Sequence, residues 1–450
     1  MNSRLQLPQT VRGVVMKRAY GNWMIGLIVS ALPVQAETNR VVVAESLALE
    51  QAYDRALATD QTIRSAAVEI QKANLLPWSA LTRQGPRVLG NASYAKPEHE
   101  LASAPLVTTK RADLAVELPL LDLTVFPAFR AGKLSAQAAR LARQFTVRHV
   151  LFGVTTAYYD VLKQQRVVEV NRQTLELARG QLDLAQKRFN VGDVTKTDVL
   201  RARVTVERGQ RTLTESENAL RLARSVLASI LNLGTESTWV LTDPPAYPVS
   251  VESLEALQER AAAGREDLRV ATLAIETAQA RRSEVIARYG PRLVAQWDNV
   301  WIDPATASQP NNFWQATVAV QIPFFEGGQR ELDLRRAGLE RTQAELSYES
   351  LTKSIAVDVK EAWLRVHSLE QTLQALHVEV EAADENYRSL EHQYRAGTAT
   401  SLDVLDALRD LNTARTDLAV ETYGYQLALR DLERVTGVFQ QARVAKVKQP

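Results

Sequence analysis

The sequence of 450 residues contains no cysteine. Disulfide bonds, thiolate metal sites and a cysteine nucleophile are therefore excluded, and we expect the chain not to be N-terminally lipidated. The five histidines are scattered and form no HExxH motif, so we expect no metal site. Neither a GxSxG motif nor a P-loop occurs, and acidic pairs on one helix face are usually solvated charge. We therefore expect no enzyme activity and no cofactor.

Long hydrophobic runs are also missing, because no segment beyond the N-terminus approaches 18 apolar residues. We therefore expect no transmembrane helix. The N-terminus has the features of an export signal: Lys17 and Arg18 precede a short apolar stretch at residues 24–32, and Ala36 suits cleavage. We assign residues 1–36 to a signal peptide, which leaves the periplasm, the outer membrane or the exterior as destinations.

Positive and negative charges are nearly balanced, with 54 Lys and Arg residues against 52 Asp and Glu residues. Removal of residues 1–36 takes away four basic side chains and no acidic one, so the formal charge changes from +2 to −2. A nearly neutral protein has no general electrostatic reason to bind nucleic acid, so we expect no nucleic-acid partner. The lead before Lys17 is long, and both Met1 and Met16 stay open as the start.

What the sequence does contain is a duplication. Residues 188–204 match residues 393–409 at an offset of 205 positions, and the "GPR" at 85–87 matches "GPR" at 290–292. The matching pairs in the longer segment are Phe189/Tyr394, Gly192/Gly397, Thr195/Thr400, Asp198/Asp403, Val199/Val404, Leu200/Leu405 and Ala202/Ala407. We therefore predict two structural repeats, 37–243 and 244–437, followed by a basic tail at 438–450.

Each repeat has the pattern helix, strand, strand, long helix, turn, long helix. The first helices are predicted at about 45–82 and 251–288, because they are rich in helix formers with helical spacing. The strands are predicted at about 86–96, 110–119, 291–302 and 313–323, and the helical hairpins at about 125–232 and 328–436. The fold class is therefore mainly α, with four strands in each chain.

The strands alternate between apolar and polar residues with a period of two. In the last strand Trp314, Ala316 and Val318 share one face, while Gln315 and Thr317 share the other. Segments of about ten residues with aromatic residues near their ends are typical of a transmembrane β-barrel. Any half-buried antiparallel sheet alternates in the same way, so this pattern alone leaves both readings open.

The long helices carry a heptad pattern on both sides of each turn, which predicts two antiparallel coiled-coil hairpins. The seam before the turns contains Leu175, Ala178, Leu182, Ala185 and Phe189, and Val380, Ala383, Tyr387, Leu390 and Tyr394. The seam after the turns contains Val199, Ala202, Val206, Gly209 and Leu213, and Val404, Ala407, Leu411, Ala414 and Leu418. Packing explains all of these residues.

The repeated turn suits the tip of a helical hairpin. Gly192 and Gly397 stand where a helix ends with positive φ. Thr195 and Thr400 can cap the next helix, and the aspartate three residues further on completes a variant of the capping box. The aspartate also faces the positive end of the helix dipole.

The paired [FY]-x-x-G-x-x-[ST]-x-x-D-V-L-x-A turns, the strand pairs and the duplication resemble the TolC-type outer-membrane efflux proteins, the outer-membrane factor family. The resemblance covers nearly the whole chain after residue 36. It implies that three protomers share a twelve-stranded barrel, with the coiled coils continuing it as a hollow cylinder. The strand count supports the need for several copies, because four strands cannot close a barrel and an open sheet edge is forbidden in lipid. At least two copies are needed; the number three comes from the resemblance.

The resemblance also implies a function and partners. It predicts the passive exit duct of a tripartite efflux pump or a type I secretion system, in the outer membrane of a Gram-negative bacterium and extending into the periplasm. The implied partners are the other copies of the homotrimer, a periplasmic adaptor, an inner-membrane pump and outer-membrane lipid. The alternative is a periplasmic coiled-coil structural protein without a pore. The sequence leaves the cargo (drug, metal or protein) and the type of pump open.

By motif position, the resemblance assigns roles at the turns. Asp403 and Asp406 match acidic residues that ring the family's periplasmic entrance. Tyr394 and Asp198 match the partners of a link that holds the helices shut, with Thr197 beside them.

One position departs from the family. The best-studied members carry an arginine two residues after the second glycine, where this chain has Ala399. We expect the closed state to be held less firmly, or to be held by Arg395 or Lys196 instead.

Overall fold

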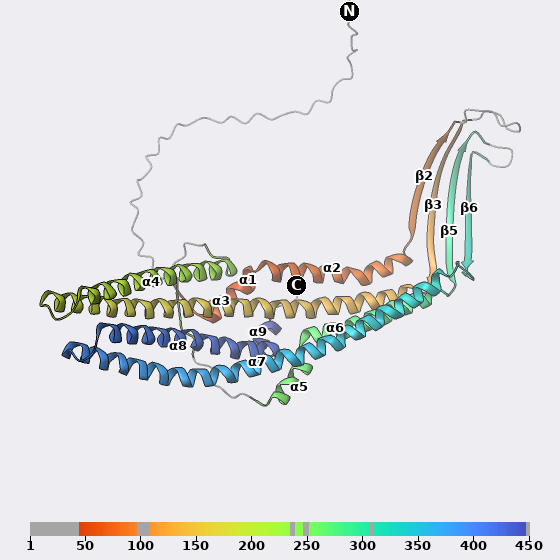
Figure 1. Cartoon of the computed structure of the whole chain (residues 1–450). Coiled ribbons are helices and arrows are strands. Elements are labelled where there is room, and N and C mark those ends of the chain that lie inside the picture. Colours follow the sequence, from red (N-terminus) through yellow and green to blue (C-terminus); the bar gives the residue numbers. More distant parts are fainter. Residues whose placement is uncertain (1–44, 97–107, 235–238, 246–251, 306–309, 447–450) are drawn as a thin grey trace, which may run out of the picture. The chain divides into compact units, whose positions relative to one another are not determined.

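The computed structural model describes residues 45–96, 108–234, 239–245, 252–305 and 310–446. The described residues belong to one compact unit. The predicted signal peptide at 1–36 lies outside the described residues. Within the described unit, long helices dominate and four long strands extend from their ends (Figure 1), so the mainly helical fold class is confirmed.

The first repeat runs from β1 to β4. Its elements are β1 (Glu45–Leu47), α1 (Leu49–Thr59), α2 (Gln61–Leu81), β2 (Arg87–Ala95), β3 (Thr109–Asp122), α3 (Val125–Asn190), α4 (Lys196–Ile230) and β4 (Trp239–Leu241). The second repeat has α5 (Leu254–Gly264), α6 (Glu266–Ala287), β5 (Arg292–Asp303), β6 (Asn312–Gln321), α7 (Gln329–Ala396) and α8 (Ser401–Val435), and α9 (Gln441–Lys446) follows. The 66-residue α3 and the 68-residue α7 are each about 100 Å long at 1.5 Å per residue.

The single first helix predicted for each repeat is two helices. Asp60 separates α1 from α2, and Arg265 separates α5 from α6; both residues have extended backbone. The Asp60 side chain accepts a hydrogen bond of 2.9 Å from the backbone N–H of Ile63, which caps α2. The uniform helical composition around both breaks concealed them.

The strands and helices follow the same lateral order. The sheet order is β2-β3-β5-β6, and every neighbouring pair is antiparallel. The helices next to these strands in the sequence pack in the order α2-α3-α6-α7. Further along α3 and α7, towards the hairpin tips, the order is α4-α3-α8-α7. The chain therefore forms a layer four elements wide. Its free sides are β2, α2 and α4 on one side and β6 and α7 on the other.

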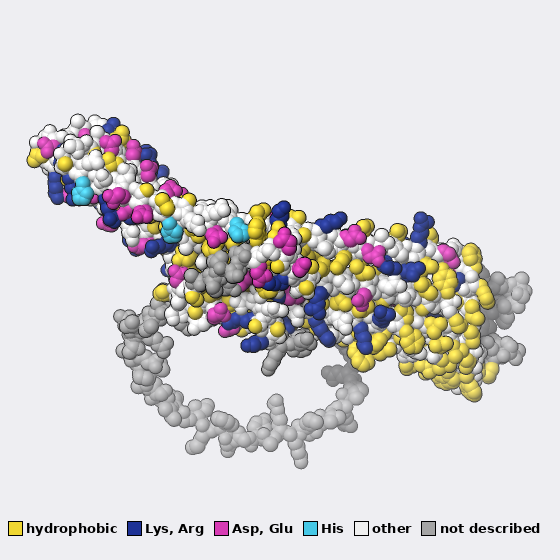
Figure 2. Space-filling view, turned by 90° about the horizontal axis from the view of Figure 1, so that it is seen from below, with side chains coloured by type: hydrophobic (Ala, Val, Ile, Leu, Met, Phe, Trp, Pro, Cys, Tyr) yellow, Lys and Arg dark blue, Asp and Glu magenta, His cyan; other side chains and the backbone are white. Residues whose placement is uncertain are grey.

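The cross-strand register groups the sheet residues by polarity. Val116, Trp297 and Ala316 stand in one row on one face. Glu117, Gln296 and Thr317 form the neighbouring row on the opposite face. The apolar face keeps large side chains exposed, and hydrophobic side chains gather at the end of the molecule that carries the strands (Figure 2). The predicted alternation is confirmed.

The residues after the second repeat pack into the protein rather than forming only a basic tail. Phe439 is fully buried, with its ring edge-on to Tyr53 and to Phe152. Arg443 in α9 forms ion pairs with Glu50 and Asp54 of α1. The aromatic ring at 439 explains why this segment returns to the core; residues 447–450 lie outside the described residues.

A buried ion pair joins the two repeats. Arg148 of α3, whose side chain is 4% exposed, donates hydrogen bonds to the Glu266 carboxylate of α6 and to the backbone carbonyl of Phe439. One side chain therefore connects both repeats and the C-terminal segment. A buried charge of this kind is tolerated only while its partner is present.

We predict that Glu266→Ala lowers the free energy of unfolding by about 3–5 kcal/mol, because it leaves the Arg148 charge buried and uncompensated. Denaturant unfolding followed by circular dichroism in detergent measures this change. Glu276→Ala is the matched control, since Glu276 is an exposed acidic residue on the same helix. Equal effects of the two substitutions would contradict the role given to the ion pair.

Candidate functional site at the hairpin tips

The two hairpin tips have the same backbone geometry. Gly192 has φ of +84° and Gly397 has φ of +82°, in the region that favours glycine. After Gly192, the N–H of Asp193 donates to the carbonyl of Arg188 at 2.9 Å. After Gly397, the N–H of Thr398 donates to the carbonyl of Gln393 at the same distance. Both long helices therefore end in the same glycine-dependent way.

Each return helix begins with a reciprocal capping box. The backbone N–H of Thr195 donates to Asp198 at 3.0 Å, and the backbone N–H of Asp198 donates to the Thr195 hydroxyl at 3.4 Å. The equivalent distances for Thr400 and Asp403 are 2.9 and 3.3 Å. The repeated Thr and Asp residues thus satisfy backbone donors that the start of a helix leaves free.

The hydrogen bonds from Thr400 hold the pKa of the exposed Asp403 carboxyl below its ordinary value. Because the folded-state pKa is lowered, the carboxylate stabilises the tip above the unfolded-state pKa of about 4. This contribution is lost as the pH falls through the lowered pKa of the folded state. At neutral pH Asp403 is charged and faces solvent.

The predicted entrance residue Asp406 stands three residues further along α8. Its carboxylate is half-buried and forms an ion pair with Arg409 on the same helix. Arg409 therefore offsets part of the negative charge that the two aspartates bring to this end of α8. The repeated motif gives no indication of this arginine, because it lies beyond the matching turn residues.

The predicted gate residues do not meet through a hydrogen bond in the single chain. Tyr394 is 3% exposed, and no hydrogen bond joins its hydroxyl to the Asp198 carboxylate. The pKa of Tyr394 is raised above its ordinary value, mainly because the side chain is buried. The Asp198 charge raises this pKa further, and the Arg188 charge partly opposes the increase. The Asp198 carboxylate is used by Thr195 and lies 3.8 Å from Arg201, while Thr197 is exposed. The Tyr394–Asp198 link stays a prediction.

The tips of the two repeats are joined by Arg188, which is not among the residues predicted for the site. Its guanidinium lies 4.8 Å from the ring centroid of Tyr394 and donates a hydrogen bond to the Tyr394 carbonyl. Arg395, one expected substitute for the family arginine, instead pairs with Glu391 of its own helix at 2.7 Å. Arg188 thus connects the end of α3 to the end of α7.

Arg188 is the last of three polar contacts spaced seven residues apart on α3. Thr174 contacts Asn412 of α8 at 2.7 Å between their side-chain oxygens, and the Gln181 amide donates to the Tyr387 hydroxyl at 3.1 Å. Seven residues is two helical turns, so the contacts lie along one stripe of α3. This stripe connects α3 of the first repeat to α7 and α8 of the second.

A comparison of the two repeats could have found Arg188. Its equivalent at the offset of 205 is Gln393, so only one copy carries a charge there. The neighbouring pair also differs in burial: Phe189 is 39% exposed, whereas Tyr394 is buried under the Arg188 side chain. Phe189 is therefore an exception to the heptad core that the sequence predicts.

Two further kinds of feature, a metal site and a membrane-spanning helix, are absent from the described residues. No three His, Asp or Glu side chains among them come together so as to hold a metal ion. None of the described helices is both long enough and apolar enough to cross a membrane.

We predict that Arg188→Gln loosens the tips of α3 and α7. A hydrogen bond to a charged donor contributes about 1.5–3 kcal/mol, so amide exchange around residues 389–400 should speed up by roughly tenfold or more. Hydrogen-exchange mass spectrometry measures this rate. Lys187→Gln is the control, because Lys187 is exposed and, among the described residues, pairs only with Asp183 of its own helix. If both variants exchange at the wild-type rate, Arg188 does not join the tips.

Comparison with known proteins is consistent with this geometry. Two stretches, residues 52–233 and 257–438, match the family described as "Outer membrane efflux protein". The chain is 26% identical over 309 residues to the outer membrane protein TolC of Vibrio cholerae, covering 67% of this chain and 70% of TolC. It is 24% identical over 388 residues to the probable efflux pump outer membrane protein TtgC of Pseudomonas putida, covering 82% of this chain and 78% of TtgC.

The fold also matches solved structures. A crystal structure of CusC superimposes with a TM-score of 0.75 at 17% identity, covering 86% of this chain and 92% of CusC. The family match falls once on each repeat and together spans more than half of the sequence. The chain therefore belongs to the outer membrane efflux protein family.

Proposed function

We propose that this protein is the outer-membrane exit duct of a tripartite efflux pump or a type I secretion system. The observation that carries the proposal is the layer with two free sides, in which the strands and the helices follow one lateral order. Copies placed side by side can close the sheet into a barrel and the helices into a tube on the same axis. The duct itself does no chemistry; a pump supplies the energy.

The sheet supports this reading through its two faces. The apolar face can meet lipid, and the face with Glu117, Arg292 and Asp113 can line water. Arg292 lies 3.3 Å from Glu117, and Asn91 donates to Asp113 at 2.8 Å, so the polar face is already internally paired. A periplasmic structural protein without a pore explains neither the exposed aromatic side chains nor the free strand edges.

The free side of α7 supports assembly of several copies. It carries large apolar side chains that are 50–67% exposed and lie opposite the face that packs on α6 and α8. These residues are Leu332, Leu339, Leu346, Val357, Leu364 and Val378. The free side of α4 presents Leu222, which is 67% exposed, in the same way. We propose that α7 of one copy packs against α2 and α4 of the next, in a ring of three.

The localisation and the other partners belong to the same proposal. The protein resides in the outer membrane of a Gram-negative bacterium, with its hairpins in the periplasm and without an N-terminal lipid. A periplasmic adaptor and an inner-membrane pump bind at the hairpin end, and the strands contact outer-membrane lipid. The export signal, the sheet faces and the family relationship support this arrangement.

We expect the double substitution Leu339→Glu, Leu346→Glu to abolish the trimer, because it places two carboxylates in an apolar contact between copies. Native mass spectrometry in neutral detergent should give a trimer for the wild type and a monomer for the variant. Ser347→Glu is the control, since Ser347 is exposed on a different face of α7. A stable wild-type monomer, or a trimeric double variant, would refute the proposed packing.

The tips give an electrostatic prediction for the entrance. We propose that Asp403 and Asp406 of three copies surround it, which favours cations where low-dielectric walls focus the field. Asp403→Ala, Asp406→Ala should weaken block by multivalent cations at least about tenfold in single-channel recordings. Arg409→Gln should strengthen the block, because it removes the charge paired with Asp406.

These two variants change the charge in opposite directions, which provides an internal control. If the double aspartate variant keeps both its block and its cation preference, Asp403 serves only as a helix cap. Its loss would then weaken the start of α8 and leave ion selectivity unchanged.

A further inference from the structure

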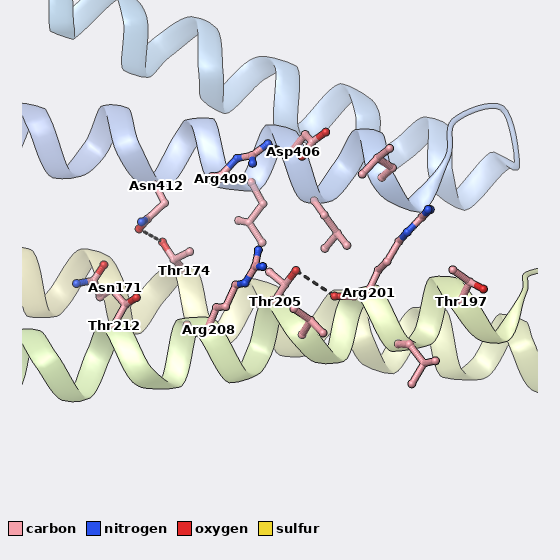
Figure 3. A pocket seen from close by; sticks show the side chains of 17 residues that line it. Asn171, Thr174, Thr197, Arg201, Thr205, Arg208, Thr212, Asp406, Arg409 and Asn412 are labelled. Atoms are coloured by element: carbon pink, nitrogen blue, oxygen red, sulfur yellow. Dashed lines mark hydrogen bonds and ion pairs between the residues drawn. The ribbon is translucent and has the colours of Figure 1, made fainter.

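A groove of about 530 Å³ lies beside the hairpin tips, between α4 and α8 and over α3 (Figure 3). The Thr174–Asn412 contact crosses its end on the α3 and α8 sides. This volume is within the range of pockets that bind small molecules, about 300–1,000 Å³. The residues of the tip turns do not fill it.

The groove has apolar walls from both return helices. Leu200 and Val204 come from α4, and Leu402 and Leu405 come from α8. Leu200, Val204 and Leu402 remain 46–49% exposed, so their side chains are only partly covered by the protein. An apolar ligand body here would remove exposed hydrocarbon from water, which is favourable in proportion to the area covered.

The same groove carries an excess of positive charge. Arg201 and Arg208 extend from α4 toward α8 (Figure 3), and Arg409 lies on α8. Asp406 is the one acidic residue among the groove's described lining residues, and Arg409 already pairs with it. The groove therefore contains two more cationic than anionic side chains.

The arginines of α4 have little local compensation. Arg201 lies 3.8 Å from Asp198, whose carboxylate also accepts hydrogen bonds from Thr195. Arg208 makes no hydrogen bond or ion pair with a described residue. A planar guanidinium without a partner is suited to bind a carboxylate or sulfate through two hydrogen bonds.

We propose that this groove binds an amphipathic organic anion, a small apolar body that ends in a carboxylate, sulfate or sulfonate. The anionic group lies between Arg201 and Arg208, and the apolar body lies on the leucine and valine side chains. The inference rests on the proposed function in one respect. Asp406 lines the groove, so the groove faces the conducting path only if Asp406 lies at the entrance as that function requires. Ligand binding itself requires no conduction.

The absence of cysteine makes a specific test possible. A bimane label on Thr212→Cys, a residue that lines the groove, reports binding in the full-length protein reconstituted in phosphatidylcholine nanodiscs. Octyl sulfate should change the fluorescence saturably, whereas octyltrimethylammonium and octanol should not. Arg201→Gln, Arg208→Gln should weaken octyl sulfate binding about tenfold or more. Arg203→Gln should bind as wild type, because Arg203 is exposed on α4 but does not line the groove.

Three outcomes would overturn the proposal. Equal responses to the anion and the cation would mean simple apolar partitioning. Equal losses in the Arg203 variant and the double variant would mean general surface attraction. No saturable response would mean that the groove is closed in the assembled protein. Single-channel conductance of the same labelled protein in planar bilayers tests the duct separately: wild-type conductance without octyl sulfate binding would leave the proposed function standing and refute this inference alone.

Discussion

The structure depends on one constraint: within the described part of the chain, the outer edges of the four-stranded sheet, at β2 and β6, have no pairing strand. Backbone donors and acceptors at a strand edge need partners, and lipid provides none. The helices repeat the same situation in another form, because the free side of α7 exposes a row of leucine and valine side chains and α4 exposes Leu222. Both layers have the same lateral order, so neighbouring copies would satisfy strand edges and apolar stripes together. Head-to-tail contacts of this kind close into rings when the rotation allows.

The duplication explains the fold, and the differences between its copies explain how the repeats hold together. The tip glycines and capping boxes are the same in both copies because they perform the same local task. The residues that join one repeat to the other are not the same. Arg188 corresponds to Gln393, and Arg148 corresponds to Lys353. The surfaces that form contacts within one chain differ from those that would form contacts between chains. The two copies therefore had no physical reason to keep identical side chains at these positions.

Local patterns in the sequence predicted much of this molecule. The period of two in the strands, the heptads and the glycine turns each depend on neighbours in sequence, and the elements lie within a few residues of their predicted positions. Long-range features were missed. The parallel pair of β1 and β4 is only three residues long on each strand. The Tyr158 hydroxyl bridges the carbonyl of Leu47, the last residue of β1, and that of Thr242, which follows β4. Nothing in so short a segment predicts its partner. The Arg188 contact was missed because it depends on how two hairpins pack, which spacing within one helix does not determine.

The central claim is that the hairpin tips and the distant strands belong to one conducting path. Thiol modification tests it most directly in a chain without cysteine. Leu402→Cys lines the tip groove and is well exposed, so a charged, membrane-impermeant methanethiosulfonate can reach it. In planar bilayers, the account predicts a stepwise change in single-channel current on modification of this residue, and no change for Arg203→Cys. Complete modification at position 402, verified by mass, with an unaltered current would contradict the account.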